Sequence, residues 1–152
     1  MKLCISTLVC PTWTFQQIID HSAEYGVQGI DFRGLASEID ITRLPFFTTD
    51  LPETLRVLGE KNLRMPCLNL STTLVTLEPE RWQDFLDETQ RYARLAQQTH
   101  TRYLRVFGGR VPKELSRDEA RELARRHLKQ LTKIALPHDC QILLETHDDW
   151  AT

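Results

Sequence analysis

The sequence has no block of lysines and arginines and no long apolar run. Its 152 residues carry 19 basic and 21 acidic side chains, a formal net charge of -2. Binding to nucleic acid through phosphate neutralisation needs clustered positive charge. A membrane-spanning helix needs about 20 apolar residues in succession. These absences argue against a nucleic-acid-binding protein and against a membrane protein.

Paired cysteine motifs and nucleotide-binding motifs are also absent. The four cysteines, Cys4, Cys10, Cys67 and Cys140, form no C-x-x-C pair and no zinc-ligand spacing. Three of them lie in or beside apolar runs, which is typical of reduced, buried thiols. Neither G-x-G-x-x-G nor a Walker sequence occurs. The composition therefore favours a cytoplasmic enzyme.

The first ten residues, "MKLCISTLVC", resemble a short secretory signal because a lysine precedes an apolar stretch. The stretch contains Ser6 and Thr7, has no small residue before Cys10, and runs through Pro11 into a helical pattern. We therefore interpret it as a first buried strand rather than a signal peptide.

Five short apolar runs alternate with four helical patterns. The runs are mostly continuous, as expected for parallel strands covered by helices. They are Leu3–Thr7, Gly29–Arg33, Met65–Leu70, Tyr103–Phe107 and Gln141–Glu145. The helical patterns are "TFQQIIDHSAEYG", "PETLRVLGEKN", "PERWQDFLDETQRYARLAQQ" and "SRDEARELARRHLKQLTKIAL", the last opening with a capping-box spacing at Ser116 and Glu119.

Two α/β architectures begin with this order, and right-handed crossovers make the strands parallel in both. Five strands in about 150 residues suit an open doubly wound sheet, whereas a complete (β/α)8 barrel needs about 250 residues. However, only seven residues, Thr146 to Thr152, follow the fifth strand, too few for a covering helix. The ending favours a sequence interrupted within a longer fold.

In both architectures function gathers where strands end and helices begin. Asp31 and Arg33 are two residues apart at the end of the second strand and point the same way. They face a polar ligand, or they form an ion pair that closes the strand end.

Polar residues also follow the third and fourth strands. Asn69, Ser71, Thr72 and Thr73 either bind sugar hydroxyls or provide turn chemistry. In "FGGR", residues 107–110, two glycines allow an anion to approach the backbone and Arg110 offers a clamp, with a flexible turn as the alternative.

The densest group of candidate ligands follows the fifth strand, in "LLETHDDWAT". Glu145 and His147 project toward the same face if strand geometry continues, with Cα atoms roughly 6–7 Å apart. A carboxylate and an imidazole suit a divalent ion. Asp148 and Asp149 follow in a terminal segment that we expect to fray. The alternative is a strand end and a solvated turn.

Three segments together resemble the N-terminal half of the xylose isomerase-like barrels, the sugar phosphate isomerase/epimerase superfamily. "LCIST" is similar to its first strand, "GVQGIDFR" to its entry into the second strand, and "ILLETH" to its fifth strand. The resemblance implies an α/β fold: a partial (β/α)8 TIM barrel with the first five parallel strands and four helices. It would form one domain over residues 1–152, truncated after the fifth strand.

The resemblance also implies a metal-dependent sugar or sugar phosphate isomerase or epimerase that moves a proton beside a carbonyl. Glu145 matches the family's metal ligand and acid/base, and His147 matches a catalytic and substrate-side group. Arg33, Asn69 and Arg110 are the further expected substrate contacts. The ion would be Mn, Mg, Co or Zn, but the other ligands come from strands six to eight, so we expect this chain alone to bind metal weakly, if at all, and to be inactive.

Other activities remain open. The superfamily includes dehydratases and abasic-site endonucleases, but the endonuclease histidines are missing after the third and fourth strands, which read "CLNLSTT" and "VFGGR". A non-catalytic half-barrel that binds itself or a complementary half is a further alternative. Exposed strand edges and an open, apolar inner layer would then drive self-association.

Overall fold

The computed structural model describes residues 2–150, so Met1, Ala151 and Thr152 of the predicted domain lie outside the described residues. All five predicted strands are present: β1 Cys4–Ser6, β2 Gly29–Asp31, β3 Cys67–Thr73, β4 Tyr103–Phe107 and β5 Gln141–Glu145. So are the four helices: α1 Phe15–Glu24, α2 Leu51–Glu60, α3 Pro79–Thr99 and α4 Arg117–Ala135. Within 2–150, no helix has the length and apolar character needed to cross a membrane.

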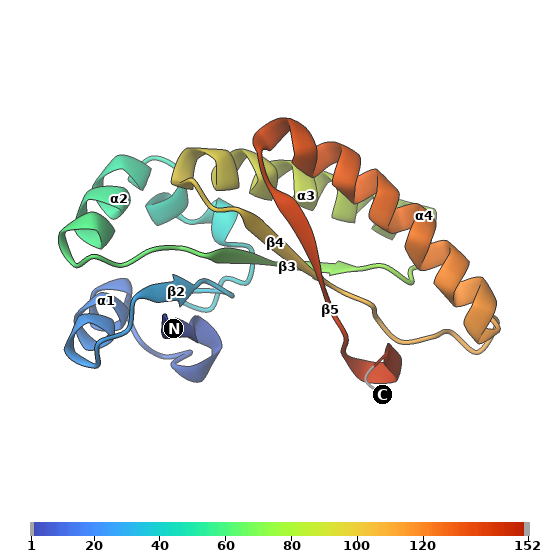
Figure 1. Ribbon diagram of the computed structural model, residues 1–152, viewed down its shortest axis with the longest axis horizontal. Helices are drawn as coiled ribbons and strands as arrows, with labels where there is room; N and C mark the ends of the chain where they lie inside the picture. The colour runs from blue at the N-terminus through green and yellow to red at the C-terminus, as the bar shows by residue number, and fades with distance from the viewer. Residues whose placement is uncertain (1, 151–152) are drawn as a thin grey trace.

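The strands are parallel and follow one another in the order expected for a barrel. β1 pairs with β2, and β3, β4 and β5 form a second sheet in that order. Single parallel bridges join Gly29 to Arg64 and Phe32 to Leu68, so β2 lies beside β3 without a continuous ladder. Figure 1 shows α3 and α4 together on one side of β3, β4 and β5. This is the α/β arrangement of a partial TIM barrel.

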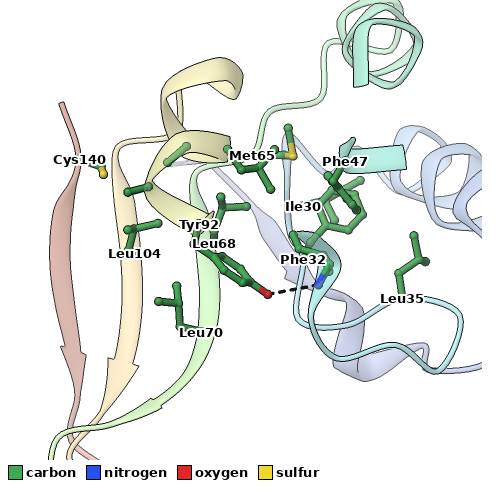
Figure 2. Close-up of a cluster of buried hydrophobic side chains, with 14 of the residues drawn as sticks. Ile30, Phe32, Leu35, Phe47, Met65, Leu68, Leu70, Tyr92, Leu104 and Cys140 are labelled. Carbon is green, nitrogen blue, oxygen red and sulfur yellow. Dashed lines mark hydrogen bonds between the residues drawn. The ribbon is translucent and has the colours of Figure 1, made fainter. Parts of the chain in front are cut away.

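The core lies between the strands and the helices that cover them. Leu68 and Leu70 of β3 and Leu104 of β4 are fully buried on this side. Figure 2 shows Tyr92 of α3 reaching toward the chain beyond β2, where its hydroxyl accepts a hydrogen bond from the Ile41 backbone N–H at 3.3 Å. One helix thus packs on β3 and also holds the connection after β2.

The third strand begins and ends later than the sequence predicts. It spans Cys67–Thr73 rather than Met65–Leu70, because Pro66 has no N–H to contribute to a ladder. Its register against β4 shifts between Asn69 and Thr73, and a bulge of this kind lets a strand continue after its pairing is interrupted. The turn interpretation of residues 69–73 is therefore wrong, because they are strand residues.

The inner face of the sheet, opposite α3 and α4, carries a connected set of polar side chains. Alternate strand residues share a face, and those on this face include Asp31, Asn69, Arg105 and Glu145, three of which contact the next along the row. The inner layer that we expected to be apolar is mixed in these strands, because Tyr103, Phe107 and Leu143 share the face of Arg105 and Glu145. Of these, Leu143 of β5 is 41% exposed.

His127 of α4 is a buried histidine that couples stability to pH. Its ring stacks on Trp82 at 3.6 Å between centroids, and its Nδ1 lies 2.7 Å from the Leu74 carbonyl oxygen. Burial lowers its pKa, although the hydrogen bond to Leu74 opposes that shift. The unfolded chain therefore binds this proton more readily, so folding stability is lost as pH falls below the unfolded pKa of about 6.5.

We expect the urea midpoint of the chain to fall between pH 7 and pH 5, and His127→Gln to flatten that fall. Glutamine does not titrate, and its amide can still donate to Leu74. His21→Gln is the matched control because His21 is on the surface of α1, and it should leave the pH dependence unchanged. Equal slopes for His127→Gln and the parent chain would contradict the assignment.

Candidate functional site

Four polar side chains from successive strands form a row along the inner face. Asn69 donates a side-chain hydrogen bond to Asp31, and the Arg105 Nε donates to the Asn69 Oδ1 at 2.8 Å. The same Arg105 Nε lies 3.2 Å from a carboxylate oxygen of Glu145. The register explains these contacts, since Asn69 is opposite Arg105, and Glu145 lies on the same face two residues after Leu143, which is opposite Arg105. We call Asp31, Asn69, Arg105 and Glu145 the polar row.

Arg105 is the centre of the row and was not identified from the sequence. It is 9% exposed, its Nη1 donates to the Leu70 carbonyl, and its guanidinium lies 4.0 Å from the Phe107 ring centroid. Burial lowers its pKa, and the nearby Glu145 carboxylate opposes that shift. Because a guanidinium stays charged at neutral pH, this is a buried cation held between two carboxylates.

Burial also affects the acidic end of the row. It raises the pKa of Asp31, against the opposing effects of the Asn69 hydrogen bond and the Arg105 charge. Beside it, burial and the Asp31 charge raise the pKa of the Cys67 thiol to about 12. A thiol with so high a pKa stays protonated, which makes Cys67 a poor nucleophile and metal ligand.

Glu145 lies where the sequence predicts it, at the carboxyl end of β5. Its side chain is 43% exposed and is held on one side by Arg105. A carboxylate fixed in this way keeps oxygen lone pairs available to a ligand on its open side. The geometry is suited to accepting a proton or coordinating a cation on that open side.

His147 is near this site but does not continue the strand. The strand ends at Glu145, and the His147 Nδ1 lies 3.2 Å from Asp148 while its ring packs edge-on against Phe107 at 5.7 Å. The alternating geometry expected for Glu145 and His147 therefore does not apply. Phe107 links the two regions, because its ring contacts both His147 and Arg105.

Arg33 reaches the same end of the sheet from the connection after β2. Its Nη1 donates to the Ser71 hydroxyl at 3.2 Å, and its backbone N–H donates to the Thr7 hydroxyl at 2.9 Å. Arg33 and Asp31 do not form an ion pair with each other among the contacts of residues 2–150, because Asp31 turns to Asn69 instead. Of the two interpretations of this pair, the ion pair that closes the strand end is therefore wrong for the described residues.

Arg110 lies apart from the polar row, in a pocket of about 470 Å³ at the ends of β3 and β4. The pocket combines arginines, carboxylates and threonine hydroxyls, a set that can hydrogen-bond a polyhydroxylated molecule from several sides. Its polar lining residues are Thr73, Thr76, Glu78, Arg81, Arg110, Glu114 and Asp148.

The segment after β5 is anchored to the β4–α4 connection, so the expected fraying of Asp148 and Asp149 is wrong. The Trp150 Nε1 donates to the Gly109 carbonyl at 2.6 Å, and an Asp149 carboxylate oxygen accepts from the Val111 N–H at 2.7 Å. A Cβ at Gly108 would lie 2.4 Å from a Trp150 ring carbon. The first glycine of "FGGR" thus makes room for an indole.

A buried glutamate behind the site was also missed. Glu88 of α3 is 6% exposed, and its two carboxylate oxygens accept from the Ser71 backbone N–H and the Thr72 hydroxyl, each at 2.8 Å. These partners lie where β3 loses register with β4. The sequence does contain a signal for this burial. Glu88 comes three residues after Phe85 and four before Tyr92, which places it on the apolar side of the "RWQDFLDETQRY" helix.

The described residues do not contain a complete metal site. Across residues 2–150 there is no group of three or more His, Cys, Asp or Glu side chains placed to hold an ion. Glu145 and His147 are suitable donor types, but Arg105 contacts the first and Asp148 the second. A catalytic divalent ion normally has three protein ligands, so these two side chains alone do not meet that requirement.

Comparisons with known proteins agree with the observed fold. A model of the xylose isomerase-like TIM barrel family matches residues 19–152. A search of curated protein sequences finds no match.

Solved structures that resemble the chain show the same fold. They include the IOLI protein with a bound zinc atom (TM-score 0.80, 16% identity, 95% of this chain and 51% of that one). Another is a probable 3-DHS dehydratase, AsbF, from Bacillus anthracis (TM-score 0.78, 21% identity, 97% of this chain and 53% of that one). A third is the 3-keto-D-glucoside 4-epimerase YcjR from E. coli (TM-score 0.75, 15% identity, 99% of this chain and 57% of that one). This chain spans about half the length of each.

Proposed function

The chain belongs to the xylose isomerase-like TIM barrel family, and on this premise we propose that it contributes the first five strands of a metal-dependent sugar or sugar phosphate isomerase or epimerase. The observation that carries the proposal is Glu145, placed at the carboxyl end of β5, held by Arg105 and open on its other side. Active sites of TIM barrels lie at this end of the strands.

In the proposed reaction Glu145 moves a proton next to a substrate carbonyl and is one ligand of a divalent ion (Mn, Mg, Co or Zn). Such an ion supplies Lewis-acid polarisation of the carbonyl. His147 contributes a second proton-transfer or substrate-side group. Arg33, Asn69 and Arg110 hydrogen-bond the substrate hydroxyls or phosphate, which positions the reacting carbon. All four cysteines are free, which supports the proposed cytoplasmic location.

A dehydratase is a second candidate, because one of the similar structures is a probable 3-DHS dehydratase. Dehydration next to a carbonyl can begin with the same proton removal, so Glu145 would serve both reactions. An abasic-site endonuclease is less well supported, because no histidine follows β3 or β4 before the next helix and the net charge is -2. A small-molecule substrate therefore fits better than nucleic acid.

The experiment that tests the proposal joins this chain to strands six to eight of a related barrel. Metal content after dialysis and turnover on a panel of ketoses, ketose phosphates and 3-keto sugars are measured. We expect about one divalent ion per assembled barrel and turnover of at least one substrate, with substoichiometric metal and no turnover for the chain alone. A folded, metal-loaded assembly that converts none of them would contradict the proposal.

The alternative role, a half-barrel that associates with a second copy or a complementary half, is supported by β5. Its Leu143 and Leu144 are 41% and 43% exposed on opposite faces, and in residues 2–150 β5 pairs with β4 alone. We expect sedimentation at about 50 µM to show dimers or larger species, and Leu143→Lys/Leu144→Lys to shift them to monomer. A parent chain that is already a folded monomer would contradict this role.

A further inference from the structure

A second pocket, of about 720 Å³, opens at the opposite ends of the strands from Glu145. It lies where β1, β2 and β4 begin and where the chain enters β3, and its lining includes Cys4, Gly29, Pro66 and Tyr103. One wall comes from the end of α2 and another from the connection between α3 and β4. The proposed reaction does not use this end of the barrel.

Positive charge gathers around this pocket without an acidic counterpart. Lys2, Arg64 and Arg102 are among its lining residues, and the lining contains neither Asp nor Glu. None of the three basic side chains forms an ion pair within the part of the chain that the structure describes. A local charge of this sign in a chain of net charge -2 favours an anionic ligand, because opposite charge raises its local concentration.

The rest of the lining is apolar and aromatic. Leu58, Leu63 and Met65 are buried side chains of the lining, at 3%, 4% and 6% exposure. The Arg102 guanidinium lies 5.6 Å from the centroid of the Tyr103 ring. An arginine beside an aromatic ring and an apolar wall can hold the charged group and the carbon body of one ligand at the same time.

We propose that this pocket is a binding site for a small organic anion with an aromatic or branched apolar body, a carboxylate or a phosphate ester. Pockets of 300–1,000 Å³ are the usual size for such ligands. Arg64 and Arg102 bind the anion through charge-assisted hydrogen bonds, and the leucines and Met65 cover the apolar body. Because TIM barrels catalyse at the other end of their strands, the site is a binding site and independent of the proposed reaction.

The test is a titration of the ¹⁵N-labelled chain with phenyl phosphate and with benzoate, followed by amide chemical shifts. Inorganic phosphate and benzyl alcohol are the half-ligands. We expect saturable shifts around residues 58–66 and 99–103 with either organic anion, and at least tenfold weaker binding of both half-ligands. Whichever of the two organic anions binds with the higher affinity shows whether the site prefers a phosphate ester or a carboxylate.

Two double variants, each of which removes two positive charges, make the test decisive. Arg64→Gln/Arg102→Gln should weaken binding about tenfold or more, since hydrogen bonds to charged groups contribute most strongly. Arg94→Gln/Arg126→Gln removes the same charge from exposed positions on α3 and α4 and should leave binding unchanged. Equal affinity for the two double variants, shifts confined to the Glu145 end, or no saturation up to about 10 mM would overturn the proposal.

Discussion

Replacing Glu145 with glutamine is expected to lower turnover of the assembled barrel about 10²–10⁴-fold, the range that a positioned general acid or base contributes. Glutamine keeps the size of the side chain and can still meet Arg105 through its carbonyl oxygen. It cannot accept the substrate proton, and it is a weaker ligand for a divalent ion because it carries no charge. The fold should therefore survive while the chemistry fails.

The measurement is turnover under saturating metal, together with bound metal per barrel. Asp84→Asn is the matched control, because Asp84 is an exposed carboxylate on the outer helix α3, and its turnover should remain that of the parent. A Glu145→Gln barrel with full activity would show that another group moves the proton. A loss of turnover that excess metal restores would assign Glu145 to metal binding alone.

Glu145 could be found from the sequence because a carboxylate directly after "ILL" contradicts the pattern of a buried strand. Desolvation makes an unpaired carboxylate costly there, so its presence indicates a partner or a ligand. The five strands were predictable because short apolar runs that alternate with helical patterns are typical of parallel strands in an α/β fold. Pro66 moved the start of β3 and the bulge moved its end, because local hydrogen bonding overrides hydrophobicity at a strand end.

Arg105 could not be found in the same way. In "YLRVF" one arginine among apolar residues fits a strand with a single solvated side chain as well as it fits a buried cation. Its importance depends on Asp31, Asn69 and Glu145, which come from three other strands, and only the register brings them together. Glu88 and Trp150 were missed for the same reason, because their partners in β3 and the β4–α4 connection are distant in sequence.

Replacing Arg105 with methionine is expected to destabilise the chain by about 2–4 kcal/mol at pH 7, since removing one member of a buried charge pair leaves the others uncompensated. The value is below the full cost of a buried pair because the Glu145 side chain is 43% exposed and water screens it. Methionine fills a similar volume and keeps contact with Phe107. The loss therefore reports the charge and the hydrogen bonds rather than a cavity.

The pH dependence distinguishes this explanation from simple loss of packing. Without Arg105 the folded-state pKa of Asp31, already raised by burial, should rise further above its unfolded value. The charged form is then disfavoured by folding, so the variant should recover stability as pH falls through that raised pKa and Asp31 becomes neutral. The difference between the urea midpoints of Arg105→Met and the parent should accordingly be largest at pH 7 and smaller near pH 4.

Arg105→Lys should recover part of the stability, because lysine keeps the charge but cannot reach Asn69, Leu70 and Glu145 with one planar fork. Arg125→Met is the surface control: Arg125 pairs with Glu122 on an exposed face of α4, and its loss should leave the midpoint almost unchanged. If Arg105→Met destabilised the chain equally at pH 7 and pH 4, with no recovery in the lysine variant, the polar row would be a packing feature. The position of the Glu145 carboxylate would then have to be explained by something other than its contact with Arg105.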